Sequence, residues 1–242
     1  MSKEKSVSEI CADERFWLKL DNIMRLDDLD QFKETINALP FVVRTSDGRQ
    51  DISLYEHHDT GNNMFYFAYT IDAPKIISYM LDNCFLKLDD KDEWGNNFLH
   101  YAAGRFNNEE NIRKLYELDR RYPAIFHLNA LSTNFFLEIP IHIAVQQNKL
   151  ENVKTIIEMH TSEDMRALLD ARDWEGCTPL YRAVQGGHLE LAQYLYKWGA
   201  HISTQSRYGV TLLQATKDKG MTEAHDWLTN KYKTLGVRYI RA

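Results

Sequence analysis

The chain has 242 residues, of which 44% are hydrophobic and 26% charged, and its formal net charge at pH 7 is −6. These fractions are typical of a soluble globular protein with enough apolar side chains to build a sizeable core. The acidic balance argues against a broad phosphate-binding surface of the kind that nucleic-acid modules carry, so we expect no nucleic-acid partner.

The cysteines and the start of the chain indicate a reducing compartment. Cys11, Cys84 and Cys177 form no CxxC pair and are odd in number, so we expect reduced thiols. Residues 1–12, which we expect to be flexible, lack the apolar run of a secretory signal, and no stretch reaches the roughly 18 apolar residues of a membrane span. The sequence therefore predicts a cytoplasmic protein without a membrane span.

The first predicted element, residues 13–40, is a divergent capping pair of helices. Its Leu29-Asp30 falls in the same frame as Leu189-Glu190 farther along the chain. Residues 40–58 then add about a dozen positions to the spacing of the units. We read them as an insertion that forms a long loop or an irregular hairpin.

Two weakly patterned units come next, near 59–91 and 92–131. The second opens with DEWGNNFLHYAA, and the segment TGNNMFYFAY places a glycine 34 residues upstream of the glycine in that motif. Surplus residues in the second unit fall at 104–110 and 121–134, which we read as loops.

The unit 134–172 contains IPIHIA at 139–144, which predicts a helix start, but Leu137 stands where the other units have glycine. Because a left-handed backbone strongly favours glycine, we expect a distorted hairpin at Leu137. Residues 160–170 place Ser162 before two acidic residues and predict an extra capped helical turn.

The unit 173–205 has the clearest pattern. Thr178 and Pro179 predict a helix start, as N-cap and first helical residue, and the adjacent Gly186 and Gly187 predict a tight turn to a second helix. Apolar residues recur at helical spacing in that second helix and predict one buried stripe.

Within this unit, residues 173–203 resemble the ankyrin repeat, whose pattern runs D-x-x-G-x-T-P-L-H-x-A, then G-H-L-E, then an apolar helix and G-A. Tyr181 replaces the usual histidine. A step of 33 residues leads from Gly176 to Gly209, which is the period of this family, and predicts a degenerate closing repeat at 206–230. The matching residues are Asp173, Gly176, Thr178, Pro179, Leu180, Ala183, Gly187, His188, Leu189, Glu190, Gly199 and Ala200.

The resemblance implies an all-α repeat solenoid of about five to six stacked helix-turn-helix units, divergent caps included, with β-hairpin-like finger loops. It implies a single ankyrin-repeat domain over residues 13–230. Residues 231–242 are basic and lie outside the repeat frame, so we expect this C-terminal tail to pack poorly or to extend.

Ankyrin repeats usually bind proteins, so the resemblance implies a protein–protein interaction module that acts as an adaptor or an inhibitor. Divergent, insertion-bearing ankyrin proteins also resemble effectors that intracellular bacteria deliver into host cells, which would place this protein in the host cytosol. The alternative is an enzyme whose site is grafted onto the insertion 40–58 or the loop 121–134. A convergence of His57, His58, Asp59 and Cys84 in one cleft would favour the enzyme.

Partners of this family usually meet the finger tips and the concave row of first helices. We expect Glu138 and Cys177 to lie at the finger tips, where Cys177 would be an exposed thiol. Aromatic residues, which are the usual anchors of interfaces, recur at the tips with acidic residues between them, so we expect a protein partner with a basic or mixed apolar and basic surface. The same aromatics could instead pack against the next repeat. The expected partner-binding residues are Glu93, Trp94, Asn96, Arg105, Phe135, Phe136, Gln146, Gln147, Trp174, Glu175, Gln185, Arg207 and Tyr208.

We expect no cofactor, no metal and no catalytic residue. The stretch 90–95 begins like a calcium loop, but Trp94 and Tyr101 occupy positions where that loop needs oxygen ligands. His100 and His142 belong to the repeat pattern, in which such histidines hydrogen-bond the backbone between repeats. Neither of the common glycine-rich phosphate loops is present.

Overall fold

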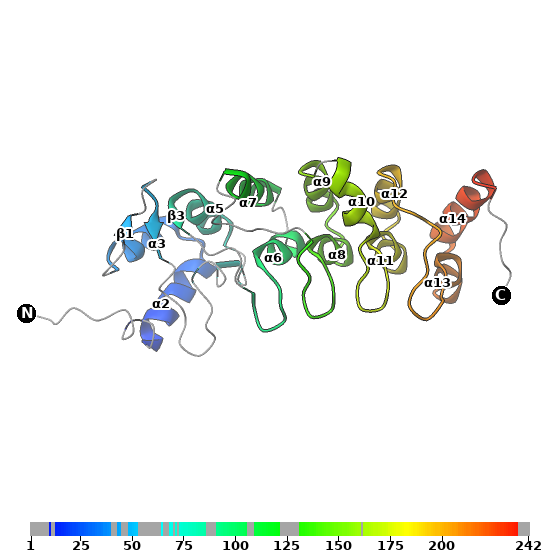
Figure 1. The fold of residues 1–242 in the computed structure, drawn as a ribbon. Helices are drawn as coiled ribbons and strands as arrows, with labels where there is room; N and C mark the ends of the chain where they lie inside the picture. Colours follow the sequence, from blue (N-terminus) through cyan, green and yellow to red (C-terminus); the bar gives the residue numbers. More distant parts are fainter. Residues whose placement is uncertain are drawn as a thin grey trace, which may run out of the picture. The chain divides into compact units, whose positions relative to one another are not determined.

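α-Helices dominate the structure, which is a computed structural model (Figure 1). It describes residues 10, 13–39, 43–44, 48–52, 64, 68–69, 71, 73–85, 91–105, 109–121, 131–160 and 162–236. Two compact units divide the chain: unit 1 comprises residues 1–102 and 108–128, and unit 2 comprises residues 103–107 and 129–242.

The helices of unit 1 pack in chain order. α3 packs against α2 and α5, and α5 packs against α7. Trp17, Leu20 and Met24 of α2 are buried together, because residues three or four apart share one face of a helix. The predicted pair of helices within 13–40 is thus present as α2 and α3, while its role as a cap stays a prediction. The helices are α2 (Glu14–Arg25), α3 (Leu29–Asn37), α5 (Pro74–Asn83) and α7 (Glu109–Arg121), and α6 (Phe98–Gly104) runs from unit 1 into unit 2.

A carboxylate from the turn between α2 and α3 caps the first turn of α5. Asp27 accepts the backbone N–H groups of Lys75 and Ile76, each at 3.1 Å. The N-cap residue of α5, Ala73, makes no side-chain cap of its own. Since the first N–H groups of a helix have no partner within it, Asp27 satisfies them from the neighbouring element and ties α5 to the capping pair.

Three two-residue strands form a small sheet in unit 1. β1 (Val43–Arg44) pairs antiparallel with β2 (Gln50–Asp51), and β2 pairs parallel with β3 (Cys84–Phe85). Within the described residues of the insertion 40–58, the antiparallel pair confirms the irregular hairpin. The parallel pairing to β3, directly after α5, was not predicted, because it joins segments more than thirty residues apart.

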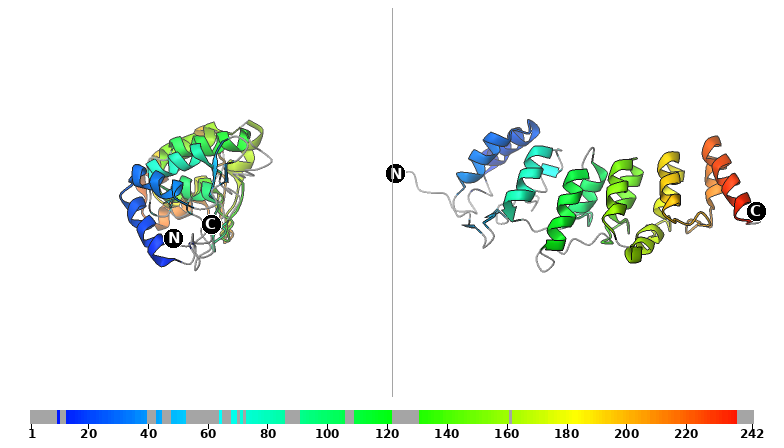
Figure 2. Two further views of the ribbon diagram at one scale, coloured as in Figure 1. Left: turned by 90° about the vertical axis from the view of Figure 1, so that its left-hand side faces the viewer. Right: turned by 90° about the horizontal axis from the view of Figure 1, so that it is seen from above.

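Unit 2 repeats one packing arrangement. The first helices α8, α11 and α13 pack one against the next, and each packs against its own second helix, α9, α12 or α14. Figure 1 shows the loops before α8, α11 and α13 side by side along one edge, and Figure 2 shows α9, α12 and α14 following one another. This stacking confirms an all-α repeat architecture. The helices are α8 (Pro140–Gln146), α9 (Leu150–Glu158), α10 (Ser162–Asp170), α11 (Pro179–Gln185), α12 (Leu189–Lys197), α13 (Leu212–Asp218) and α14 (Thr222–Thr234).

The local signals in 173–205 act as predicted. Thr178 is the N-cap of α11, and its hydroxyl accepts the Tyr181 N–H at 3.2 Å, while Pro179 occupies the first helical position. α11 ends at Gln185, and Gly187 follows with a φ of 76°. The extra helical turn predicted at 160–170 is confirmed as α10, which packs against α11.

The predicted boundary between the last repeat and a poorly packed tail is wrong at residues 231–234. These residues continue α14, and Tyr232 is buried with its hydroxyl donating to the Ile202 carbonyl at 2.6 Å. Burial of this aromatic ring extends the helix beyond the repeat frame. Residues 237–242 lie outside the described part. Among the described residues, every helix is too short or too polar to span a lipid bilayer.

Candidate functional site

Four loops of the chain share one backbone geometry and are called fingers 1 to 4, residues 92–96, 134–138, 173–177 and 206–210. In each, the first residue donates its N–H to the carbonyl of the fifth and accepts the N–H of the fourth, at 2.8 to 3.0 Å. The fourth residue has a positive φ, between 54° and 80°. The predicted β-hairpin-like finger loops are therefore confirmed in the described residues.

The first side chain of each finger also caps its own loop. Asp173 Oδ1 accepts the N–H groups of Glu175 at 2.9 Å and Cys177 at 3.0 Å. Asp92 and Asn134 make the same two bonds in fingers 1 and 2, and Ser206 accepts one, from Tyr208, in finger 4. Because both oxygens of Asp92 bond groups of its own finger, its part in the calcium-like stretch is that of a loop cap.

The expected distortion at Leu137 is wrong. Leu137 adopts a φ of 54°, the conformation that Gly95, Gly176 and Gly209 adopt in the other fingers. Its N–H donates to the Asn134 carbonyl at 3.0 Å, as in the rest of the set. The hydrogen bonds of finger 2 therefore hold a leucine in a region that normally favours glycine.

Backbone bonds join fingers 2, 3 and 4 of unit 2. The Trp174 N–H donates to the Phe136 carbonyl at 2.9 Å, and the Arg207 N–H donates to the Glu175 carbonyl at 2.7 Å. The Arg207 guanidinium also donates to the Trp174 carbonyl at 2.7 Å. These bonds fix the three loops relative to one another, so their tips form one continuous surface.

Exposed aromatic rings mark these three tips. Phe135 is 73% exposed, Trp174 43% and Tyr208 68%, although large apolar side chains usually gain most from burial. Phe135, Phe136, Trp174 and Tyr208 are together called the aromatic tips. Leu137 of finger 2, and Leu131 shortly before that finger, are also exposed and were not predicted as binding residues. For Leu137 the sequence did contain a signal, because a large apolar residue stands there at the position where the other fingers have the turn glycine.

Two buried side chains tie the finger bases to the first helices. His142 of α8 accepts the Ile139 N–H on Nδ1 at 3.3 Å, so Nε2 carries the proton and donates to the Cys177 carbonyl at 3.2 Å. Burial lowers the pKa of His142 to about 4, which keeps this neutral form. Tyr181 of α11 donates to the Val210 carbonyl at 3.1 Å and so reaches the next finger in the histidine's place. The predicted inter-repeat role of His142 is confirmed.

Arg182 of α11 organises the polar groups behind finger 3. It donates to Asp173 Oδ2 at 2.6 Å, to Glu175 Oε2 at 2.6 Å and to Gln185 Oε1 at 2.7 Å. Asp173 and Glu175, two of the acids that suggested a basic partner surface, are therefore already paired with a cation. The expected exposed thiol at Cys177 is wrong, because that residue is buried beneath this network.

The ends of the first helices contribute amides beside the fingers. Gln146 and Gln147 are exposed, and the Gln146 amide donates to Glu138 Oε1 at 2.6 Å. Glu138 itself is buried, which removes it from the tip positions. Gln185 is half-buried, and Arg105 is half-buried with its carbonyl accepting the Asn152 amide at 2.7 Å.

Finger 1 belongs to unit 1. Its Trp94 is 53% exposed and its Glu93 is exposed, whereas Asn96 is half-buried and bonds Asp92 through its amide at 3.0 Å. The chain thus presents an aromatic finger in each unit, but the bonded set of tips is that of unit 2. Three pairs of predicted tip residues lie on neighbouring, hydrogen-bonded fingers there, as expected: Phe135 and Phe136, Trp174 and Glu175, and Arg207 and Tyr208.

The described residues do not assemble a catalytic or metal centre. In that part of the chain, no three His, Cys, Asp or Glu side chains come together as metal ligands would. Burial raises the pKa of Cys84 to about 12 and that of Cys177 to about 11, so both are protonated thiols near neutral pH. His57, His58 and Asp59 lie outside the described residues, so the structure does not test whether they converge with Cys84 as the enzyme alternative requires.

Comparisons with known proteins point to one family. A family model described as ankyrin repeats (3 copies) matches residues 123–206. An ankyrin repeat protein of Rickettsia bellii (strain RML369-C) is 26% identical over 110 residues, which cover 46% of this chain and 64% of that protein. The chain thus spans less than two thirds of the length of this relative. The matched range of the family model contains fingers 2 and 3 with α8 to α12.

Proposed function

Because this chain is an ankyrin-repeat protein, and such repeats are generally protein–protein interaction modules, we propose that it binds a partner protein through the aromatic tips of unit 2. The observation that carries the proposal is the exposure of Phe135, Trp174 and Tyr208 on loops whose backbones are bonded to one another. Aromatic side chains on a rigid frame lose little conformational entropy on binding, which favours affinity.

The row of first helices in the same unit would extend the contact. Gln146 and Gln147 at the end of α8, and Gln185 at the end of α11, offer amides that hydrogen-bond a partner's backbone or polar side chains. Around the aromatic tips the charges nearly cancel, because Glu138, Asp173 and Glu175 are matched by Arg172, Arg182 and Arg207. A partner surface that meets unit 2 would therefore be apolar and polar, whereas a basic partner surface would suit Glu93 beside Trp94 in unit 1.

The expected roles of adaptor, inhibitor or delivered bacterial effector, and the cytosolic location, are part of the same proposal. Free thiols at Cys84 and Cys177 support a reducing compartment. The relative of bacterial origin supports the effector role. A catalytic function on the insertion 40–58 or the loop 121–134 is the alternative proposal, and most of both segments lies outside the described residues.

The test compares two variants that remove aromatic rings from different places. The first combines Phe135→Ala, Trp174→Ala and Tyr208→Ala; the second is Trp198→Ala, whose ring follows α12 and is 43% exposed, the same fraction as that of Trp174. Immobilised protein should capture a specific partner from a cytosolic lysate, and the triple variant should lose it, because each anchor contributes about 2 kcal/mol.

Thermal unfolding must first show that both variants remain folded. With the captured partner identified and purified, the triple variant should bind at least about 30-fold more weakly and Trp198→Ala within about twofold. Equal capture by the triple variant, or an equal loss in Trp198→Ala, would refute the proposal that the aromatic tips are the binding surface.

A further inference from the structure

A second surface lies in unit 1, along the side of α2 that faces away from its buried residues. It is an open groove of about 340 Å³ and is called the α2 groove. Six of its lining residues belong to α2 or to the C-cap of that helix, and Gln31 comes from the first turn of α3. The lining residues are Arg15, Leu18, Lys19, Asn22, Ile23, Leu26 and Gln31.

Helix periodicity gives α2 two different faces. Trp17, Leu20 and Met24 are buried on one face, and α2 packs against α3. Leu18 and Leu26 lie on the opposite face, where they are 63% and 76% exposed. Leu26 is the most exposed large hydrophobic residue in the described part of the chain. Exposed apolar residues that share one groove with polar residues are typical of interaction surfaces.

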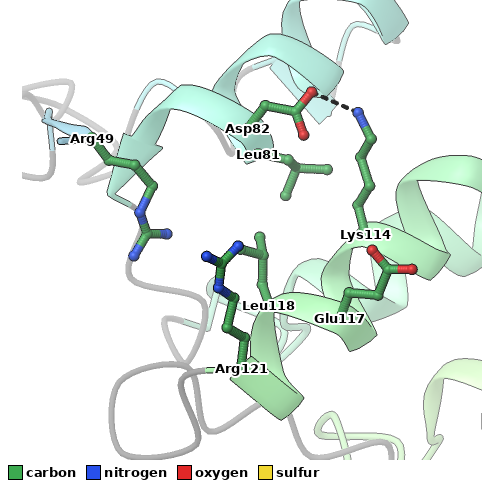
Figure 3. Close-up of a pocket in the computed structure, with 7 residues that line it drawn as sticks. All are labelled: Arg49, Leu81, Asp82, Lys114, Glu117, Leu118 and Arg121. Atoms are coloured by element: carbon green, nitrogen blue, oxygen red, sulfur yellow. Dashed lines mark hydrogen bonds and ion pairs between the residues drawn. The ribbon is translucent and has the colours of Figure 1, made fainter. Parts of the chain in front are cut away.

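The α2 groove is basic, although the whole chain has a net charge of −6. Arg15 and Lys19 are both exposed, and neither side chain forms an ion pair within the described part of the chain. The residues that line the groove include no carboxylate. Lys114, a cation elsewhere in unit 1, is by contrast paired with Asp82 at 2.7 Å (Figure 3). The α2 groove therefore presents two positive charges that a partner's carboxylates would complement.

The spacing of the two leucines suits a helical partner. Leu18 and Leu26 are eight positions apart on α2 and its C-cap, which at about 1.5 Å per residue places them about 12 Å apart along the helix axis. Two turns of a partner helix span this distance and present apolar residues at i, i+4 and i+7 on one face. A lipid surface fits less well, because α2 buries its main apolar face inside unit 1 and leaves only two leucines to insert.

We propose that the α2 groove docks an acidic amphipathic helix of a partner protein. The apolar residues of that helix pack over Leu18 and Leu26, and its carboxylates face Arg15 and Lys19. This surface lies in unit 1 and is independent of the aromatic tips, so either proposal can fail without the other.

The probe is a fluorescein-labelled helical peptide in which leucines recur at i, i+4 and i+7 and glutamates flank them. It is titrated with the full chain and followed by fluorescence anisotropy. The intact chain should bind it saturably, and Leu26→Ser should weaken binding about tenfold or more, because an apolar contact at the centre of the groove is lost. Leu26 is exposed in the free chain, so its replacement should leave the fold intact. Leu235→Ser, at the exposed C-cap of α14, is the matched control and should bind within about twofold.

Lys19→Gln tests the charge of the groove. It should weaken binding about threefold at low ionic strength and less in added salt, because exposed charge pairs are screened. Lys217→Gln, on the exposed face of α13, is the matched control and should leave binding unchanged. The same peptide with lysine in place of each glutamate should bind at least about tenfold more weakly. Equal binding of the two peptides would contradict an acidic partner, and unchanged binding in Leu26→Ser, or no saturable binding by the intact chain, would overturn the site itself.

Three further measurements separate the other possible occupants. Binding of the intact chain to vesicles of phosphatidylserine and phosphatidylcholine that is lost in Leu26→Ser would overturn the proposal in favour of a membrane surface. A dimer in analytical ultracentrifugation that Leu26→Ser dissociates would assign the groove to a second copy of the chain instead. The combined variant Phe135→Ala, Trp174→Ala and Tyr208→Ala should bind the acidic peptide as the intact chain does, and a loss there would place the peptide on the aromatic tips.

Discussion

Replacement of Asp173 separates two roles that its carboxylate plays behind finger 3. Oδ1 accepts the N–H groups of Glu175 and Cys177, and Oδ2 accepts the Arg182 Nε–H at 2.6 Å. Asp173→Asn keeps one oxygen for the backbone but turns an NH₂ group toward the guanidinium. Asp173→Ala removes both roles. Finger 2 shows that asparagine fits, since Asn134 caps that loop in the same way.

The magnitude follows from burial and from what Arg182 retains. Loss of one member of a buried ion pair costs about 3 to 5 kcal/mol when the remaining charge has no other partner. Arg182 keeps Glu175 at 2.6 Å and its side chain is 12% exposed, so we expect about 2 kcal/mol for Asp173→Asn. Asp173→Ala also strands two N–H groups at about 1 kcal/mol each, for a total near 4 kcal/mol.

The assay is urea unfolding followed by far-ultraviolet circular dichroism, with the free energy obtained by linear extrapolation. Asp170→Asn is the matched control, because its contact with Arg166 is an exposed pair at 3.6 Å and should be worth less than about 0.5 kcal/mol. If Asp173→Asn were as stable as the intact chain, the ion pair would contribute nothing. If it were as unstable as Asp173→Ala, the capping role assigned to Oδ1 would be wrong.

Three further predictions test the interior of unit 2. Burial lowers the pKa of His142 from 6.5 to about 4, so the unfolded chain binds the proton more tightly than the folded chain. The free energy of unfolding should therefore fall by up to about 3 kcal/mol as the pH drops through this window. Urea titrations at several pH values should show a smaller fall for His142→Gln. Gly176→Ala should lower the melting temperature more than Gly209→Ala. Both positions have a positive φ, but of the two only a Cβ at 176 would meet the Arg207 backbone nitrogen, at 2.8 Å. Equal shifts in melting temperature would contradict the role of this contact. Tyr232→Phe should cost about 1 kcal/mol in chemical unfolding through its lost bond to a buried carbonyl, whereas no change would indicate a loosely packed α14 terminus.

Local signals in the sequence predicted a helix correctly wherever the residues that begin and end that helix lie within one short segment. Thr178, Pro179 and Gly187 define the ends of α11 through caps and backbone freedom that involve only nearby residues. The same is true of α10. At Leu137 the local rule failed, because the hydrogen bonds of the finger outweigh the preference of one residue for a right-handed backbone.

The sequence predicted which residues stand at the finger tips, but it did not predict that their side chains form an exposed surface. A repeat pattern places Phe135, Trp174 and Tyr208 at equivalent sites, whereas their exposure depends on how neighbouring fingers bond. The pairing of Asp173 and Glu175 with Arg182 was not predicted, since it depends on a side chain that reaches back from the following helix. Sequence spacing alone suggested free acidic charge there.

The sequence by itself determined the repeat, its period and most helix ends in unit 2, because these depend on interactions between residues a few positions apart. Only the tertiary structure decided which charges are neutralised and which tips are bonded into one surface. Those outcomes join segments distant along the chain, and their energies depend on burial and direction, which spacing in a sequence does not specify.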